Sequence, residues 1–308
     1  QYVKFRVCSI SGNNVTIEYV VEEDVKPNAN ANAKDKSGYS LNLEIPRLNE
    51  ANVFVAHSLK VNGAELLNYA LEWDDTKKHS SWVAFAFDET TRKAGDGVKR
   101  KDKFVVDPLL PEAMQVTDEQ HKSDGFDRGH ICGSADRLFT QEANDQTFYF
   151  SNMSPMIHSF NSPYWAEFEE QVRKWGGAEK DFTTTYSKLY VVKGGALNEL
   201  LVSYTGQKNG GDNIKPTTDA NGFTKGGLAC PKYYFMAVLS ETDGAYHAIG
   251  FRVEHKEYSK APTLEELKAS ALSIDELEEK TGIDFFCNLP DDLENTVESS
   301  MNLDDWAW

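Results

Sequence analysis

The chain has 308 residues, 40% hydrophobic and 12% aromatic, which is enough to bury a substantial core in one large domain with or without an appendage. Its formal net charge of −17 counts against tight non-specific binding to a polyanion, although net charge says nothing about the chemistry at a site. No run approaches the roughly 20 apolar residues that cross a bilayer, so we predict no membrane span.

Residues 1–24 show the alternation of a β-hairpin, with a turn at Gly12-Asn13-Asn14. The alternating apolar residues are Val3, Phe5, Val7, Val15, Ile17 and Tyr19. The segment 27–38 repeats Asn-Ala and is poor in apolar residues, which is typical of a linker. We therefore divide the chain in two. Residues 1–38 are a hairpin and linker, either the remnant of an upstream domain or an edge ribbon, and residues 39–308 are the main domain.

The main domain mixes strands and helices without a regular alternation. Apolar runs bounded by turn residues predict core strands at 82–87, 189–192, 233–239 and 248–251. Because no βαβ period is visible, the pattern favours an α+β fold with a central, mainly antiparallel sheet flanked by helices.

The C-terminal region predicts an acidic helical extension. Thr263-x-x-Glu266 and Ser273-x-x-Glu276 are capping boxes that predict two helix starts, and Gly282 is expected to end the second helix. Residues 263–308 hold thirteen acidic residues and two lysines, so they carry 11 of the excess negative charges and leave −6 on the rest of the chain.

A basic cluster precedes the most informative part of the sequence. It comprises Lys77, Lys78, Arg92, Lys93, Lys99, Arg100, Lys101 and Lys103. A solvated loop face and a surface that binds a polyanion explain this cluster equally well.

The most informative stretch is Asp127-Arg128-Gly129-His130, followed by Ser151-Asn152-Met153-Ser154-Pro155 and then by Asn161. A histidine can take a proton from water near neutral pH. The carbonyl oxygen of an asparagine suits a hard divalent cation that keeps most of its waters. Together these residues provide the parts for metal-assisted hydrolysis of a phosphodiester.

An amphipathic helix is predicted after Ser162-Pro163, because proline is compatible with the first turn of a helix. Its apolar stripe is Trp165, Phe168, Val172 and Trp175. Asn161, Glu169 and Arg173 are spaced at i, i+8 and i+12, so we expect them to share one broad side of that helix. We therefore expect two strands and this helix to converge on one point.

These motifs, together with Phe160-Asn161, Trp165, and Glu169 with Arg173, resemble the DNA/RNA non-specific endonuclease family. These are sugar-nonspecific nucleases with a ββα-metal (His-Me finger) fold and a DRGH motif, and the match extends over residues 41–258. The resemblance implies a Mg²⁺-dependent (or Mn²⁺-dependent) endonuclease that hydrolyses phosphodiester bonds of DNA and RNA with little sequence specificity. It also allows an inhibitor protein as a partner.

The resemblance implies a role for each residue of the motif. His130 is expected to be the general base, Asn161 the direct ligand of a hydrated Mg²⁺, and Glu169 the residue that orients metal-bound waters. Asn152 is expected to steady the base, and Arg128 to support the loop that carries it.

Two positively charged side chains are expected to contact the substrate, and the sequence departs from the family at several positions. Arg173 should neutralise the phosphoryl charge. Lys78 stands where the family has an arginine that contacts phosphate, and lysine lacks the bidentate fork of arginine. Gly133 and Met156 replace a proline and a glutamine that related sequences commonly have, and Ser162-Pro163 also departs from the family pattern.

Several alternatives stay open at this point. A catalytically weak or inactive module that binds polyanions or a partner on the same fold is the main one, and a hydrolase for another phosphodiester is the second. Asn152 and Asn161 could also be turn and cap residues only, and Glu169 and Arg173 a simple surface pair.

We expect an extracytoplasmic location, whether secreted, periplasmic or surface-anchored, because nucleases of this family must be kept from the host genome. The chain begins at Gln1 in strand-like sequence without a signal peptide, which suggests a trimmed or mature form. The cysteines do not decide the compartment, because disulfides and free thiols are both compatible with their number and spacing: Cys8, Cys132, Cys230 and Cys287.

Overall fold

The computed structural model describes residues 2–12, 14–22, 28–208 and 214–308. At the N-terminus, β1 (Tyr2–Ser11) and β2 (Asn14–Glu22) pair in the antiparallel sense, which confirms the predicted hairpin. Among the described residues, no helix is both long and apolar enough to cross a membrane. Cys132, Cys230 and Cys287 are buried free thiols.

The segment that we predicted as a linker is hydrogen-bonded to the C-terminal region from Asn28 onward. The side-chain amide of Asn28 donates to the Cys287 carbonyl at 2.9 Å, and that of Asn30 donates to Glu294 at 2.8 Å. Asn32 is buried and its amide donates to the Pro46 carbonyl at 2.9 Å. A domain boundary at residue 38 stays a prediction.

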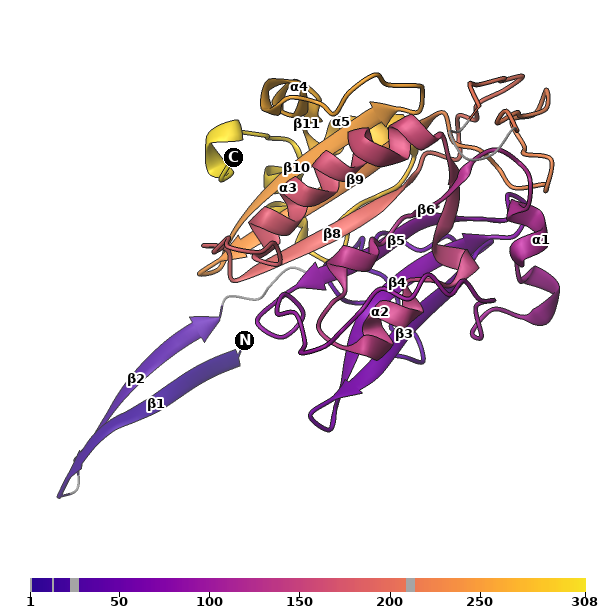
Figure 1. Ribbon diagram of the computed structural model, residues 1–308. Helices are drawn as coiled ribbons and strands as arrows, with labels where there is room; N and C mark the ends of the chain where they lie inside the picture. Colours follow the sequence, from indigo (N-terminus) through magenta and orange to yellow (C-terminus); the bar gives the residue numbers. More distant parts are fainter. Residues whose placement is uncertain (1, 13, 23–27, 209–213) are drawn as a thin grey trace.

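A seven-stranded sheet forms the centre of the molecule, in the order β11-β10-β9-β8-β5-β4-β3 (Figure 1). All neighbouring strands are antiparallel, which confirms the expected α+β fold with a central antiparallel sheet. The strands are β3 (Val53–Val61), β4 (Ala64–Asp74), β5 (His79–Phe87), β8 (Lys188–Gly195), β9 (Tyr233–Thr242), β10 (Ala245–Glu254) and β11 (Ala271–Leu272).

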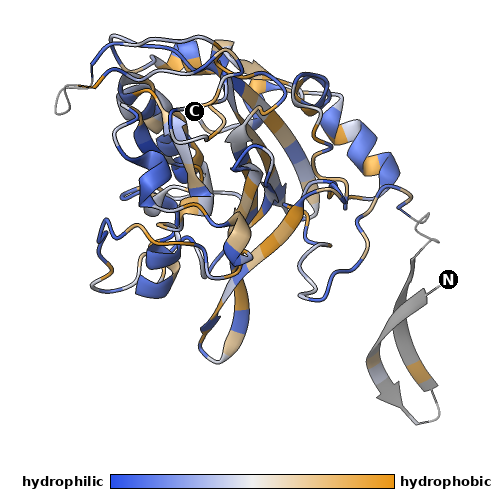
Figure 2. Cartoon of the chain, turned by 90° about the vertical axis from the view of Figure 1, so that its right-hand side faces the viewer, coloured by the Kyte–Doolittle hydropathy of each residue, from blue (hydrophilic) through white to orange (hydrophobic). Residues whose placement is uncertain are grey.

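Both faces of the sheet are covered. Alternate residues of a strand point to opposite faces, so one strand contributes to the core on each side. In β9, one set of residues packs in a core cluster with α3 (Ala166–Gly176), and the other set packs with α5 (Ile274–Thr281) and α6 (Asp291–Glu298). The two sets are Tyr234, Met236 and Val238, and Phe235, Ala237 and Leu239. Figure 2 shows that the most apolar residues follow the central strands, whereas the outer helices and loops are largely hydrophilic.

The remaining helices are short. They are α1 (Asp118–His121), α2 (Gln141–Gln146) and α4 (Leu264–Ala269), with the 3-10 turns Glu112–Met114, Ser134–Asp136, Phe150–Asn152 and Leu303–Asp305. Both predicted capping boxes are present at the starts of α4 and α5, and Gly282 ends α5 with a φ of 73°.

The C-terminal tail packs against α3. Trp306 is 4% exposed and its ring centroid lies 4.5 Å from that of Trp175, while the Ala307 carbonyl accepts a hydrogen bond of 2.7 Å from the Trp175 indole. The tail therefore supports the helix that carries Glu169 and Arg173.

Trp306→Ala should lower the free energy of unfolding by about 3–5 kcal/mol, because it leaves a cavity beside Trp175. Equilibrium unfolding in urea measures the change. Asp304→Ala, an exposed change in the same tail, should alter stability by less than about 0.5 kcal/mol. Equal effects of the two substitutions would show that the tail does not support α3.

Candidate active site

A hairpin followed by a helix carries the residues of the motif. β6 (Asp127–His130) pairs in the antiparallel sense with β7 (Met153–Met156), and α3 follows after the short π-helical segment η4 (Phe160–Trp165). The returning strand therefore begins at Met153, one residue after Asn152, which ends a 3-10 turn.

Asn161 does not lie on the same regular helix as Glu169, so our expectation of one shared helical side was wrong. Ser162 has extended dihedral angles (φ −143°, ψ 121°), and regular α-helix begins only at Ala166. The reason is local, because the residue before a proline is disfavoured in the helical region, and Pro163 follows Ser162.

Gly129 is the position of closest approach inside the hairpin. A Cβ atom there would lie 2.2 Å from the sulfur of Met156, which is fully buried. Met156 thus fills the space beside Gly129, and a larger residue there would require this methionine to move.

Asn152 is fully buried and closes the loop that follows His130. Its side-chain oxygen accepts from the Cys132 amide at 2.8 Å, and its side-chain nitrogen donates to the carbonyls of Cys132 (2.9 Å) and Thr147 (2.8 Å). With every polar atom used by the backbone, Asn152 is suited to position this loop.

His130 ends β6 and is held between aromatic rings. Its ring centroid lies 4.7 Å from Phe148 and 5.9 Å from Phe104, and its Nε2 atom is buried without a hydrogen-bond partner among the described residues. Burial, and then the positive charges of Arg100 and Lys193, lower the pKa of His130 to about 3. The imidazole is therefore neutral at physiological pH and can accept a proton.

Asn161 is tied to the start of β6. Its side-chain nitrogen donates to Asp127 Oδ2 at 2.9 Å, and the same oxygen lies 2.9 Å from His158 Nδ1. This contact fixes the orientation of the amide, so its carbonyl oxygen points away from the carboxylate. A neutral oxygen donor held in this way fits a hydrated Mg²⁺.

A network of charged residues extends from the buried Lys193 and Asp136, whose charges act on His130, to the partly exposed Glu169, Arg173 and Glu179. Lys193, which is 1% exposed, contacts Glu169 and lies 3.3 Å from Asp136. Arg173 pairs with Asp136 at 3.2 Å and with Glu179 at 3.0 Å. Burial opposes ionisation of Asp136, but Lys193 and Arg173 lower its pKa below the usual range.

Two basic residues near His130 make cation–π contacts with the aromatic rings that pack against it. The guanidinium of Arg100 lies 5.2 Å from the Phe148 centroid, and that of Arg128 lies 5.0 Å from Phe104. Arg100 is 52% exposed and pairs with the exposed Asp102 at 2.7 Å, and Arg128 pairs with Asp118.

Lys78 is placed differently. It lies on the turn between β4 and β5, where its ammonium is 2.6 Å from Asp75 and 3.5 Å from the Ala113 carbonyl. Neither partner belongs to the groups that surround His130.

The comparisons with known proteins agree with this geometry. Residues 50–292 match the family model described as DNA/RNA non-specific endonuclease. The chain belongs to this family. Its nuclease relatives include a nuclease of Syncephalastrum racemosum, 30% identical over 73% of the chain and 67% of the relative. Nuclease EXOG of Danio rerio is 25% identical over 74% of the chain and 62% of that protein.

A solved structure shares the fold of this nuclease. The chain in "Crystal structure of the EndoG/EndoGI complex: Mechanism of EndoG inhibition" matches with a TM-score of 0.58 and 20% identity, covering 78% of this chain and 89% of that one. The expected ββα-metal nuclease fold is thereby confirmed.

The extracytoplasmic location that we expected is wrong on these comparisons. The EXOG relatives and Nuclease 1 of Schizosaccharomyces pombe are named as mitochondrial proteins. Our premise was that a non-specific nuclease must be kept from the host genome. An organelle membrane also separates a nuclease from the nuclear genome, so the premise does not require an extracytoplasmic location.

Two residues of this charged network, Lys193 and Asp136, were not expected from the sequence of this nuclease. Lys193 lies in the apolar strand β8, and a lone lysine inside such a run was the available signal, since a buried lysine is rare unless it is paired. The alternative of a surface pair between Glu169 and Arg173 is wrong, because the ion pairs of these residues are made with Lys193, Asp136 and Glu179.

Gly133 has a role that proline cannot fill. Its backbone N–H donates to Asp136 Oδ2 at 3.0 Å, and proline has no N–H. The departure from the family at this position therefore adds a hydrogen bond to a buried carboxylate.

Proposed function

We propose that this nuclease is a metal-dependent endonuclease that hydrolyses phosphodiester bonds of both DNA and RNA, with His130 as the general base. The observation that carries the proposal is the placement of His130 at the end of β6, the strand whose Asp127 accepts a hydrogen bond of 2.9 Å from the Asn161 amide. A neutral imidazole at this place can accept a proton from water.

Asn161 would hold a Mg²⁺ (or Mn²⁺) directly, and Glu169 would act through metal-bound water. The donor set fits, because a single neutral oxygen ligand suits an ion that retains most of its waters. When bound, the ion would stabilise negative charge at the phosphoryl group and at the leaving oxygen.

The other residues proposed for the site either position His130 or neutralise negative charge. Asn152 holds the loop after His130, and Arg128 lies over Phe104, the ring that contacts His130. Arg173 keeps Asp136 ionised and adds positive charge for the phosphoryl group. None of these roles uses a base edge or the ribose 2′-hydroxyl, so both nucleic acids are substrates with little sequence preference.

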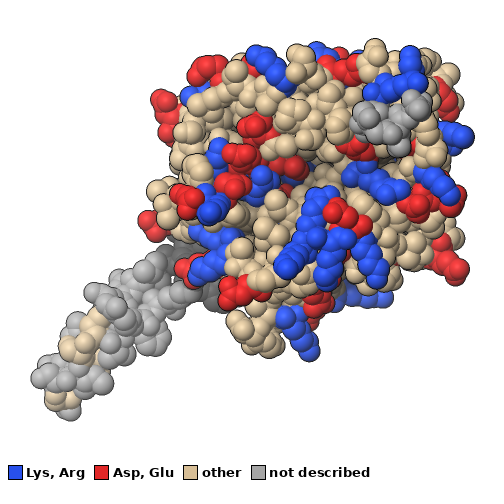
Figure 3. Space-filling view, in the orientation of Figure 1, with Lys and Arg blue, Asp and Glu red and all other residues tan. Residues whose placement is uncertain are grey.

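The substrate backbone would lie along the basic segment 99–103. This segment is bonded to α2 through Lys99 with Gln141 and through Lys101 with Asp145. Figure 3 shows Lys and Arg side chains gathered in the centre of the face that bears α2. We assign the main phosphate contact to Arg100, which is exposed beside His130, and a secondary one to Lys78.

The test is digestion of supercoiled plasmid and total RNA by the wild type and by Asn161→Ala, with Mg²⁺, with Mn²⁺ and with EDTA. Both substrates should disappear with either metal and persist in EDTA, and Asn161→Ala should be slower by at least about 100-fold. The exposed Asn295→Ala serves as the matched control and should cut like the wild type.

The alternative is a module on the same fold that binds polyanions without cutting them. Plasmid and RNA that stay intact with both metals, but shift on a gel with folded protein, would establish this alternative and overturn the proposed activity. An inhibitor protein is a further proposed partner, since the solved structural neighbour is described in an EndoG/EndoGI complex.

A further inference from the structure

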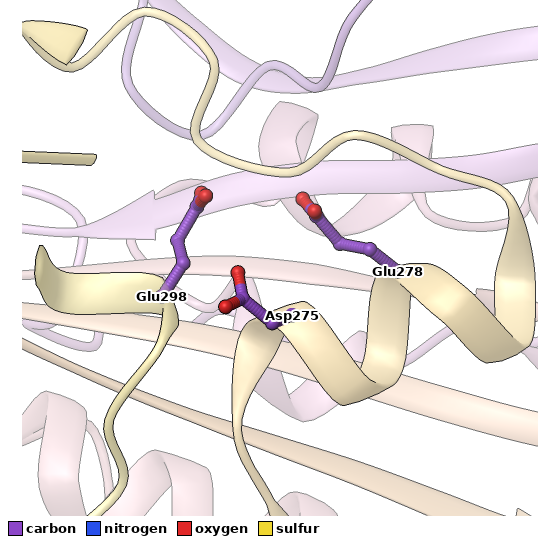
Figure 4. Close-up of side chains that lie close together, drawn as sticks. All are labelled: Asp275, Glu278 and Glu298. Atoms are coloured by element: carbon purple, nitrogen blue, oxygen red, sulfur yellow. The ribbon is translucent and has the colours of Figure 1, made fainter. Parts of the chain in front are cut away.

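Three carboxylates converge between α5 and α6, on the opposite face of the sheet from α3. Asp275 and Glu278 come from α5, and Glu298 comes from the end of α6 (Figure 4). One carboxylate oxygen of each residue can be chosen so that all three lie within 4.8 Å of one another.

Glu298 is the unusual member of this acidic cluster. It is only 5% exposed, and its Oε1 atom has no hydrogen-bond partner among the described residues. It is also the last residue of α6, which has no basic residue in its last turn. A negative charge at the C-terminal end of a helix is unfavourable, because the helix dipole is itself negative there.

The surroundings of Glu298 add further negative charge. Burial, and then the acidic groups Glu278, Glu294, Asp284 and Asp275, raise the pKa of Glu298 to about 10. Burial and neighbouring acids also raise the pKa of Glu278 to about 8. Partial compensation comes from neutral donors, since Phe285 N–H donates to Glu278 at 2.7 Å. Such a cluster must either hold protons or bind a cation.

We propose that Asp275, Glu278 and Glu298 form a Ca²⁺ site that ties α5 to α6. Calcium takes several oxygen ligands in a flexible geometry, whereas Mg²⁺ demands near-ideal octahedral geometry and is usually held by one or two carboxylates. Three carboxylates with oxygens within 4.8 Å of one another therefore favour Ca²⁺.

The consequence of this site is structural. Both α5 and α6 pack on β10, so a cation between them would fix the acidic C-terminal region on the central sheet. The site does not share a residue with the candidate active site, and the inference does not depend on the proposed function.

The experiment is calorimetric titration of Ca²⁺ into the full chain carrying Asn161→Ala, which removes the proposed active-site ligand. One Ca²⁺ per chain should bind with a Kd between about 10⁻⁶ and 10⁻³ M. Adding Glu298→Gln should weaken binding at least tenfold. Adding Glu279→Gln, which removes the same charge from an exposed position of α5, should leave the affinity within twofold.

A second measurement separates loss of the ion from loss of the fold. Saturating Ca²⁺ should raise the Tm of the wild type but not that of Glu298→Gln, which should fold because glutamine is neutral and keeps the shape of the side chain. No binding of Ca²⁺ up to 10 mM would overturn the proposal and indicate that the carboxyls hold protons. An equal affinity in Glu298→Gln, or binding of Mg²⁺ without Ca²⁺, would overturn it as well.

Discussion

His130→Ala should reduce plasmid and RNA cleavage in Mg²⁺ by a factor of about 10²–10⁴, the usual contribution of a positioned general base. The side chain is held by Phe148 and Phe104, and its buried Nε2 has no hydrogen-bond partner among the described residues, so its removal mainly deletes the proton acceptor. Initial rates with both substrates measure the effect.

His247→Ala is the matched control for this prediction. His247 is 45% exposed and pairs with Asp305 at 3.0 Å, on a different part of the molecule from β6. It should cut at the wild-type rate. Equal rates for His130→Ala and the wild type would refute His130 as the base, even if the nuclease activity itself is confirmed.

The pH profile of the wild type gives the same assignment an independent test. Because the pKa of His130 is lowered to about 3, the fraction of neutral imidazole does not change between pH 8 and pH 5. The rate should therefore lack the fall near pH 6.5 that an ordinary histidine base produces. Such a fall would show that His130 is protonated in the working enzyme.

The residues that could be predicted from sequence are those whose role depends on near neighbours in the chain. Capping boxes satisfy backbone groups within four residues, so Thr263 and Ser273 predicted the starts of α4 and α5. His130 ends β6 and Asn152 directly precedes its partner strand β7, so the short spacing of the two motifs predicted that they lie at the same end of one hairpin.

The residues that could not be predicted are joined by long-range contacts. Lys193 lies 57 residues from Asp136 and 24 from Glu169, and only the packing of β8 against α3 brings them together. The Asp275–Glu278–Glu298 cluster likewise needs the placement of α6 beside α5. The expectation that Asn161 shares a regular helix with Glu169 failed for a local reason. Pro163 disfavours helical dihedral angles at Ser162, and the periodicity of the apolar residues does not show this.

Lys193→Met should destabilise the protein by about 3–5 kcal/mol, because it leaves Glu169 and Asp136 buried without their shared cation. Asp136 retains Arg173, so the larger loss falls on Glu169. Urea unfolding measures the change. Lys188→Met, a partly exposed change on the same strand, should cost less than about 1 kcal/mol.

The double variant Lys193→Met with Glu169→Gln distinguishes a structural lysine from one that also serves the reaction. Glu169→Gln removes the carboxylate that has lost its cation. This should recover at least half of the lost stability, because burying a neutral amide costs far less free energy than burying a carboxylate. Cleavage should stay low, since Glu169 is the residue proposed to orient metal-bound water. If activity returns together with stability, Glu169 acts only through the fold, and its proposed place in the active site is wrong.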